Sequence, residues 1–466
     1  MMNSDLQGNE VTNASSKSLE AYQQAVTAFN LYRGDPIALL DNALETSPDF
    51  PMAHIAKGFM LALSSEPVAI EQAWRDLSRV RELKMNDRER SLLHAAQVLS
   101  AGRWNETARM LNLHNMRFPL DLLGLQAGHL LDFYCADSRN MRERIARALP
   151  FWSEQVPGYS VLLGMYAFGL EEDGHYPQAE DTGRKALVME PFDCWAHHAV
   201  AHVMEMQGRP EDGIGWMLAR EPYWSEEVNF FKVHNWWHRA VFHIDLGQTD
   251  HALALYDSAV RHAQSPVALE LVDASALLWR LHLCGVDVGR RWDELAQVWC
   301  HHADGKTYPF NDWHAAMAFL GAGRDQELNT LMQTMRESLV DSPSADWIKR
   351  VGLPLVQGFV AFWRSNYQEA ALTLLSARRF AGTFGGSHAQ RDIIDLTLIE
   401  AALRGGVHDI YPSIINERTA VRPYSRMTLD FSKRGSLVKD AGLGSRTDSR
   451  TKGGDDMLFQ QLNLTP

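Results

Sequence analysis

The amino-acid sequence predicts an all-α fold built from repeated helical hairpins. Apolar residues recur at helical spacing, and a short turn pattern recurs at intervals close to 34 residues. No segment shows the strict alternation of polar and apolar residues that a half-buried strand requires. A repeat chain grows by adding units, so 466 residues need not divide into several globular domains. Hydrophobic residues make up 45% of the chain, which is enough for a continuous core.

The turn pattern is a small residue, followed two places later by an aromatic or polar residue and often three further on by Ala. Its copies begin at Gly102, Gly174, Gly208, Gly247, Gly323 and Ser365, with a divergent copy at Gly285. From Gly174 to Gly208 is 34 residues, and from Gly208 to Gly247 is 39. Glycine suits this place because it can end a helix in the left-handed conformation. Such intervals are typical of tetratricopeptide-like helix–turn–helix units whose helices vary in length.

These units predict a tetratricopeptide-like α-solenoid over residues 18–426, a right-handed superhelix of about eleven helical hairpins. Prolines at positions 119, 191, 266 and 309 fall between units, where one helix has ended and the next begins. Residues 1–17 are polar and are expected to be disordered. Residues 427–466, rich in Gly, Ser, Thr and charged residues, are expected to form a disordered tail. The apolar stretch MLFQQLNL (457–464) within it is either incidental or a docking motif.

Composition and charge exclude several classes of partner. The net charge is −13, and sequence-independent nucleic-acid binding needs a basic surface, so no nucleic-acid partner is expected. No apolar run is long enough for a transmembrane helix, so no membrane is expected either. The first residues lack the apolar core of a signal peptide, and the four cysteines form no C-x-x-C pair. We therefore expect a cytoplasmic protein with reduced thiols.

Three sequence blocks in the middle of the chain carry a more specific resemblance. They are GMYAFGLEEDGHYPQAE (164–180), DCWAHHAVAHVMEMQGR (193–209) and VHNWWH (233–238). In this order they resemble the tetratricopeptide repeat protein 38 family. The likeness continues at VDASALLWRL (272–281), NDWHAAMAFLGAGR (311–324), GGSHAQRD (385–392) and INERTAVRPYS (415–425), and covers roughly residues 18–425. The resemblance implies a cytosolic solenoid and no established reaction.

Histidines recur at helical spacing in the expected first helices of neighbouring units. His198 and His202 are four residues apart, so both project from one helix face, and Glu205 joins that face. His234 and His238 repeat the same spacing in the next unit. First helices of successive units line the concave surface of such a solenoid, so the two pairs are expected to face one groove.

Distances from the turn glycines support a shared site. His198 lies ten residues before Gly208, whereas His238 and His314 each lie nine residues before their turn glycines. Asp273 lies twelve residues before the divergent turn. Side chains at matching heights on neighbouring helices converge. The expected site comprises His198, His202, Glu205, His234, His238, Asp273 and His314, joined by His388 and Arg391 if the superhelix curls far enough.

The GGSHAQRD segment has two interpretations. Ser387 and Gln390 match the Ser-x-x-Gln capping box that starts a helix. The free amides of a helix start also favour an anion, and His388 and Arg391 could add charge to a bound carboxylate or phosphate.

The histidines leave three interpretations open. They could line a pocket, rich in His, Asp and Trp, that binds a protein partner or a small polar or anionic ligand. They could hold a divalent metal through His198, His202, His234 and His238, although no H-E-x-x-H motif is present. They could also be structural hydrogen-bonding groups. The pocket interpretation predicts a binding protein. The alternative is an enzyme using the cluster for acid–base or metal-dependent chemistry. Neighbouring tryptophans are expected to pack in the core.

Overall fold

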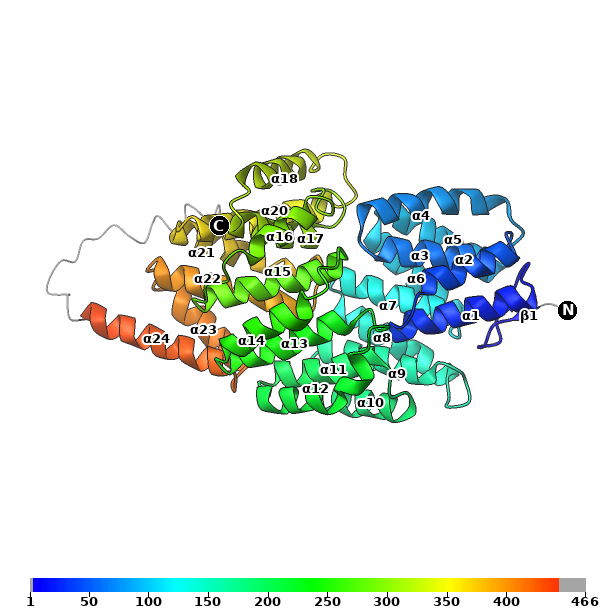
Figure 1. Cartoon of the computed structure of the whole chain (residues 1–466), viewed down its shortest axis with the longest axis horizontal. Helices are drawn as coiled ribbons and strands as arrows, with labels where there is room; N and C mark the ends of the chain where they lie inside the picture. The colour runs from blue at the N-terminus through cyan, green and yellow to red at the C-terminus, as the bar shows by residue number, and fades with distance from the viewer. Residues whose placement is uncertain (1–2, 444–466) are drawn as a thin grey trace, which may run out of the picture.

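The computed structural model describes residues 3–443, with side chains up to residue 434, and shows an elongated array of helices (Figure 1). Helices account for 73% of the chain. The first twelve are α1 (Ser16–Leu31), α2 (Pro36–Thr46), α3 (Pro51–Leu63), α4 (Pro67–Arg79), α5 (Asp87–Ser100), α6 (Trp104–Arg117), α7 (Leu122–Tyr134), α8 (Ser138–Ala148), α9 (Tyr159–Glu172), α10 (Tyr176–Met189), α11 (Cys194–Met206) and α12 (Pro210–Trp224). They are followed by α13 (Lys232–Asp245), α14 (Thr249–Leu255), α15 (Ala268–Leu283), α16 (Arg291–Trp299), α17 (Pro309–Gly321), α18 (Asp325–Glu337), α19 (Ala345–Trp347), α20 (Leu353–Trp363), α21 (Tyr367–Arg378), α22 (His388–Arg404), α23 (Ile410–Val421) and α24 (Arg426–Leu443).

Consecutive helices pack in pairs, which confirms the predicted all-α architecture of helical hairpins. Over residues 3–443 the pairs are α1/α2, α3/α4, α5/α6, α7/α8, α9/α10, α11/α12, α13/α14, α15/α16, α17/α18, α20/α21 and α22/α23. The short α19 and the last helix α24 lie outside this pairing. Neighbouring first helices also pack side by side, as α9 does on α11, and α15 does on both α13 and α17. That stacking is what a solenoid of hairpins requires.

The predicted turn glycines lie in the hairpin turns. Gly174, Gly208 and Gly247 have φ values of 82°, 65° and 72°, in the left-handed region that glycine enters without a steric penalty. Ser365 holds the same conformation with φ 62° although it carries a side chain. The repeated turn pattern therefore reflects the need for a left-handed backbone conformation at each turn. This need is the same in every unit, so the pattern is recognisable even where the helices differ in length.

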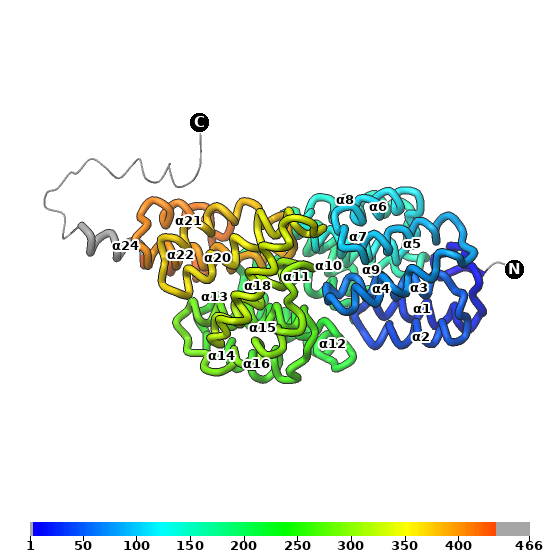
Figure 2. The backbone as a smooth tube through the Cα atoms, turned by 90° about the horizontal axis from the view of Figure 1, so that it is seen from above, coloured from blue at the N-terminus to red at the C-terminus, as the bar shows by residue number. Residues whose placement is uncertain are grey.

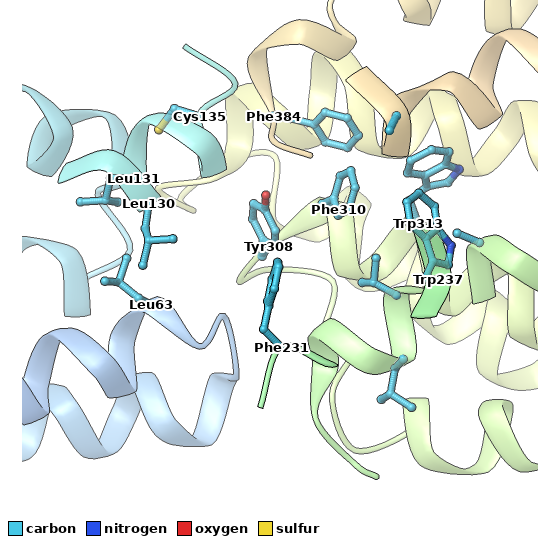
Figure 3. Close-up of a cluster of buried hydrophobic side chains, with 14 of the residues drawn as sticks. Leu63, Leu130, Leu131, Cys135, Phe231, Trp237, Tyr308, Phe310, Trp313 and Phe384 are labelled. Atoms are coloured by element: carbon cyan, nitrogen blue, oxygen red, sulfur yellow. The ribbon is translucent and has the colours of Figure 1, made fainter. Parts of the chain in front are cut away.

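Distant units also touch, so the solenoid curls back on itself. The ring of Tyr308, just before α17, lies 5.4 Å from the ring of Tyr134 in α7 and 5.5 Å from that of Trp104 in α6. Figure 3 shows Tyr308 between the leucines of α7 and a cluster that contains Phe310 and Trp313. In Figures 1 and 2 the helices α1–α6 lie at one end of the long axis and α20–α24 at the other. Helix α22 packs on α15 and α11 and covers the surface that an open solenoid would expose.

The expected disorder of residues 1–17 is wrong for residues 3–17. Strands β1 (Asn3–Ser4) and β2 (Glu10–Val11) form a short antiparallel hairpin, and α1 begins at Ser16. The backbone N–H and hydroxyl of Thr12 donate to Glu89 of α5 at 2.8 and 2.7 Å. Composition predicts order from apolar burial. Here buried charged groups of α5 hold the polar segment through hydrogen bonds, so composition does not predict its order.

The expected disorder of residues 427–466 is also wrong where the structure describes them. Helix α24 continues to Leu443, and Phe431 is buried. The Arg434 guanidinium pairs with Glu400 of α22, and Ser425 donates to Asp245 of α13 at 2.7 Å. One buried ring, an ion pair and a hydrogen bond just before the helix hold this polar helix in place. The apolar stretch at 457–464 lies outside the described residues.

Within residues 3–443, no helix is both long enough and apolar enough to span a membrane.

Candidate functional site

Two helices of neighbouring hairpins bring the four histidines together. His198 and His202 project from α11, and His234 and His238 project from α13. His198 Nε2 lies 3.0 Å from His234 Nε2, and His234 Nε2 lies 3.2 Å from His238 Nε2. One ring nitrogen of each histidine lies within 4.8 Å of one from each of the others. The four-histidine cluster (His198, His202, His234 and His238) is therefore a single site.

Carboxylates hold the outer nitrogens of the two α13 histidines. His234 Nδ1 lies 2.9 Å from both oxygens of Asp273 on α15, and His238 Nδ1 lies 3.0 Å from Glu205 Oε2 on α11. A carboxylate accepts hydrogen bonds, so each Nδ1 is the protonated nitrogen of its ring. Both Nε2 atoms then carry lone pairs directed into the cluster. The structure thus brings Glu205 and Asp273 into the expected site as partners of the histidines.

The two α11 histidines differ in their support. His202 Nδ1 lies 3.3 Å from Glu171 Oε2 and 3.8 Å from Glu172 Oε1, both on α9, which leaves its Nε2 for the cluster. His198 has no carboxylate partner, and its Nδ1 is buried without a hydrogen bond. Carboxylates therefore hydrogen-bond the two α13 rings and lie close to the His202 ring without a hydrogen bond to it, and His198 has no carboxylate neighbour.

The inward nitrogens of His234 and His238 have no proton between them when both Nδ1 atoms are protonated. Two lone pairs 3.2 Å apart, as on His234 and His238, repel each other unless a proton or a metal ion lies between. Nitrogens bound to one tetrahedral zinc ion at about 2.05 Å are roughly 3.3 Å apart, close to the separations found here. Carboxylate-held histidines with converging Nε2 atoms are the usual arrangement around a protein-bound metal.

Aromatic side chains enclose the cluster and exclude water. The ring of Trp237 stacks on His234 at 5.4 Å, Phe168 lies 5.2 Å from the rings of both α11 histidines, and Trp195 lies 5.1 Å from His198. The tryptophans therefore pack around the site, as expected. His202 and His238 have no exposed surface. The site is thus a closed interior, where the sequence predicted an open concave groove.

Burial keeps the imidazoles of His198, His202 and His238 neutral. It lowers the pKa of His198 and His238 well below the ordinary range and the pKa of His202 to about 4. Burial also raises the pKa of the carboxyl groups of Glu205 and Asp273. A neutral imidazole is the form that binds a metal, and a protonated ring is disfavoured here.

His314 lies elsewhere. Its Nδ1 pairs with the backbone carbonyl of Phe310 at 2.8 Å, one turn earlier in α17, and its ring lies against Phe310 and Trp313. The matched distance from its turn glycine gave the height of His314 along the helix but not the direction of its side chain. His314 is therefore not among the residues that the structure brings to the cluster.

The last unit reaches the site through the start of α22. Ser387 and Gln390 form both halves of the predicted capping box. The backbone N–H of His388 donates to the Glu172 carboxylate at 3.0 and 3.2 Å, and Arg391 Nη2 lies 3.7 Å from Glu172 Oε2. The anion at this helix start is thus a side chain of the protein itself. His388 and Arg391 contact the outer carboxylates and not the histidines.

Two cavities lie beside the site. A cavity of about 30 Å³ borders Glu205, Arg280, Asp392 and Arg422, with room for one or two water molecules. A surface pocket of about 270 Å³ shares Asp392 and Arg422 with it and extends to His388 and Arg391. The small cavity beside Glu205 and the surface pocket are therefore neighbours that share two lining residues.

Sequence reasoning missed Glu171 and Glu172. A signal was present: Glu171 lies three residues before Gly174, and Glu205 lies three residues before Gly208. The two glutamates thus occupy the same position in successive units, and both end beside a histidine of the cluster.

Comparison with known protein families gives no family model that matches this chain.

Proposed function

We propose that the protein binds a divalent first-row metal ion at the four-histidine cluster. The observation that carries the proposal is the orientation of the rings: three Nδ1 atoms face carboxylates, and the Nε2 atoms converge. Purely structural histidines would alternate donors and acceptors across each contact. Facing lone pairs with no donor between them are what a cation satisfies.

The ligand chemistry favours zinc. Imidazole nitrogen suits Zn²⁺, Cu²⁺, Fe²⁺ and Ni²⁺, and four ligands in a compact, closed cluster suit the tetrahedral preference of Zn²⁺. The atoms that converge inside the cluster are imidazole nitrogens and not the oxygen ligands that Mg²⁺ or Ca²⁺ prefers. The buried position argues against a protein partner touching these side chains, so we place peptide binding second to metal binding.

Metal content tests the proposal. Protein stripped with a chelator and reloaded with Zn²⁺ is expected to retain the ion through gel filtration. The double variant His234→Ala/His238→Ala is expected to lose it, because only two ligands remain. The control His94→Ala/His262→Ala removes two exposed histidines and is expected to retain the ion. Wild-type protein that holds no Zn²⁺, or equal retention by both double variants, would show that the cluster is structural.

A metal-dependent enzyme is a second candidate, and His198 favours it. Catalytic zinc sites have three protein ligands and one exchangeable position. His198 is the ring without a carboxylate neighbour, and a cavity with room for water borders Glu205. The variant His198→Ala is expected to keep the metal and to change the visible spectrum of the Co²⁺-loaded protein, as water replaces imidazole. Loss of the metal in this variant would favour a saturated, structural site.

The assignment to the tetratricopeptide repeat protein 38 family stays a proposal that rests on the sequence blocks quoted above.

A further inference from the structure

A second group of ligand atoms adjoins the four-histidine cluster. Glu171, Glu172 and His202 each offer an atom within 4.8 Å of the others, and all three side chains are buried. The ring of His202 belongs to both groups. Its Nδ1 faces the two glutamates at 3.3 and 3.8 Å, which leaves Nε2 for the other histidines. One imidazole thus separates two clusters of ligands.

Glu171 lies 3.3 Å from His202 Nδ1 and beside the carboxyl group of Glu172, but among the described residues no lysine or arginine forms an ion pair with it. Its side chain has no exposed surface, and neither of its oxygens accepts a hydrogen bond within the described residues. An unpaired buried carboxylate costs several kcal/mol, so such a group either holds a proton or meets a cation. Glu172, by contrast, accepts a hydrogen bond from the backbone N–H of His388 at the start of α22, and its oxygens still have free lone pairs.

Local charge favours a cation beside these two carboxylates. Glu171 and Glu172 lie next to each other, with Glu205 nearby as a third carboxylate. Arg391 approaches Glu172 at 3.7 Å, and Arg422 approaches Glu205 at 3.8 Å. One guanidinium group thus lies near Glu172 and another near Glu205, whereas none forms an ion pair with Glu171 among the described residues.

We propose that Glu171, Glu172 and Nδ1 of His202 hold a second divalent cation, so that the imidazole of His202 bridges two metal ions. The proposal rests on the proposed function, because the first ion is the one in the four-histidine cluster. Binding of the second ion displaces the proton on His202 Nδ1 and any proton held between the two glutamates. Both protons pass to solvent, and the bridging ring becomes an imidazolate.

Metal stoichiometry tests the second site. Wild-type protein, stripped and then titrated with Zn²⁺, is expected to bind about two ions per chain, and the variant Glu171→Gln about one. The control Asp173→Asn removes the next acidic side chain, which pairs with Arg142 outside the site, and is expected to bind two. One ion in both wild type and Glu171→Gln would overturn the second site and leave the first intact. No ion in wild type would overturn the proposed function itself.

EPR of the Cu²⁺-loaded wild-type protein tests the imidazole bridge directly. This measurement does not require that a variant folds. Two Cu²⁺ ions joined by an imidazolate are magnetically coupled, so their low-temperature EPR intensity is expected to fall well below that of two isolated ions. Glu171→Gln loaded with Cu²⁺ is expected to give the full signal of one isolated ion. A full two-ion signal from wild type would show that His202 does not bridge the ions. A one-ion signal would show that Glu171 and Glu172 share a proton in place of a metal.

Discussion

A single carboxylate at the site determines which nitrogen of a histidine ring is protonated and in which direction the ring points. Asp273 does this for His234 with both of its oxygens at 2.9 Å, and it comes from a different hairpin. A ring fixed in this way loses less freedom when it binds a metal, and its inward nitrogen is more basic.

Removal of this carboxylate charge is therefore expected to weaken metal binding without unfolding the protein. We expect Asp273→Asn to lower the Zn²⁺ affinity roughly 10- to 100-fold, measured by competition with a chromophoric chelator. The exposed Asp250 offers a control, and Asp250→Asn is expected to leave the affinity unchanged. An unchanged affinity in Asp273→Asn would argue that His234 is not a ligand.

A second residue-scale prediction concerns Asp312, which is buried in α17 away from the cluster. Burial raises the pKa of its carboxyl group from 3.8 to about 8, and one oxygen has no partner. The folded protein keeps this proton over a pH range in which the unfolded chain has released it. The stability linked to Asp312 is therefore complete below pH 3.8 and is lost as the pH rises towards 8, at up to about 1.4 kcal/mol per pH unit.

The variant Asp312→Asn removes this titration and keeps the acceptor for the N–H of Gly305. We expect its free energy of unfolding in urea to exceed that of wild type by a margin that grows between pH 5 and pH 8. Asp341→Asn, on an exposed side chain, serves as the control. A difference that does not change with pH would show that Asp312 is charged in the folded state.

Several residues of the site were predictable, and others were not, for physical reasons. The spacing of four residues placed each histidine pair on one helix face, and turn distances aligned α11 with α13. The prediction that His314 joins the cluster was wrong, because its distance from the turn glycine fixes its height along the helix and not its direction around the helix axis. Glu171 and Glu172 were missed because carboxylates near a helix end ordinarily face solvent.

At the scale of elements, the repeat pattern predicted the hairpins, and composition failed at both ends of the chain. Polar composition predicts disorder when apolar burial is the only source of stability considered. Helix α24 instead buries Phe431 and bonds its Arg434 to Glu400.

We therefore expect truncation after Arg426 to destabilise the protein. Loss of the buried Phe431 ring alone is worth about 3 kcal/mol, judged from aromatic truncations in protein cores. The control is truncation after Leu443, which keeps α24 and is expected to melt close to wild type. Equal melting temperatures for the two truncated chains would show that α24 adds nothing to the fold.

For the whole molecule, closure determines what the inner surface can do. Repeat spacing describes contacts between neighbouring units only, so it predicts an open groove. Closure depends on particular side chains that meet across many units, such as Tyr308 with Tyr134 and Glu172 with the start of α22. Such pairings leave no periodic signal in the sequence. They turn a concave surface into an interior, where histidines stay neutral and carboxylates need partners.

The proposed metal ion would join four hairpins, so its removal is expected to lower the stability of the whole chain. The ligands and their carboxylates come from α9, α11, α13 and α15, and the unfolded chain cannot hold them together. Free Zn²⁺ at 100 times its dissociation constant adds about 2.7 kcal/mol, which raises the melting temperature by a few degrees. Scanning calorimetry with Zn²⁺ or with a chelator measures this shift. The double variant His234→Ala/His238→Ala is expected to melt at one temperature in both conditions. A chelator effect of equal size in this variant would place the stabilising metal somewhere other than the four-histidine cluster.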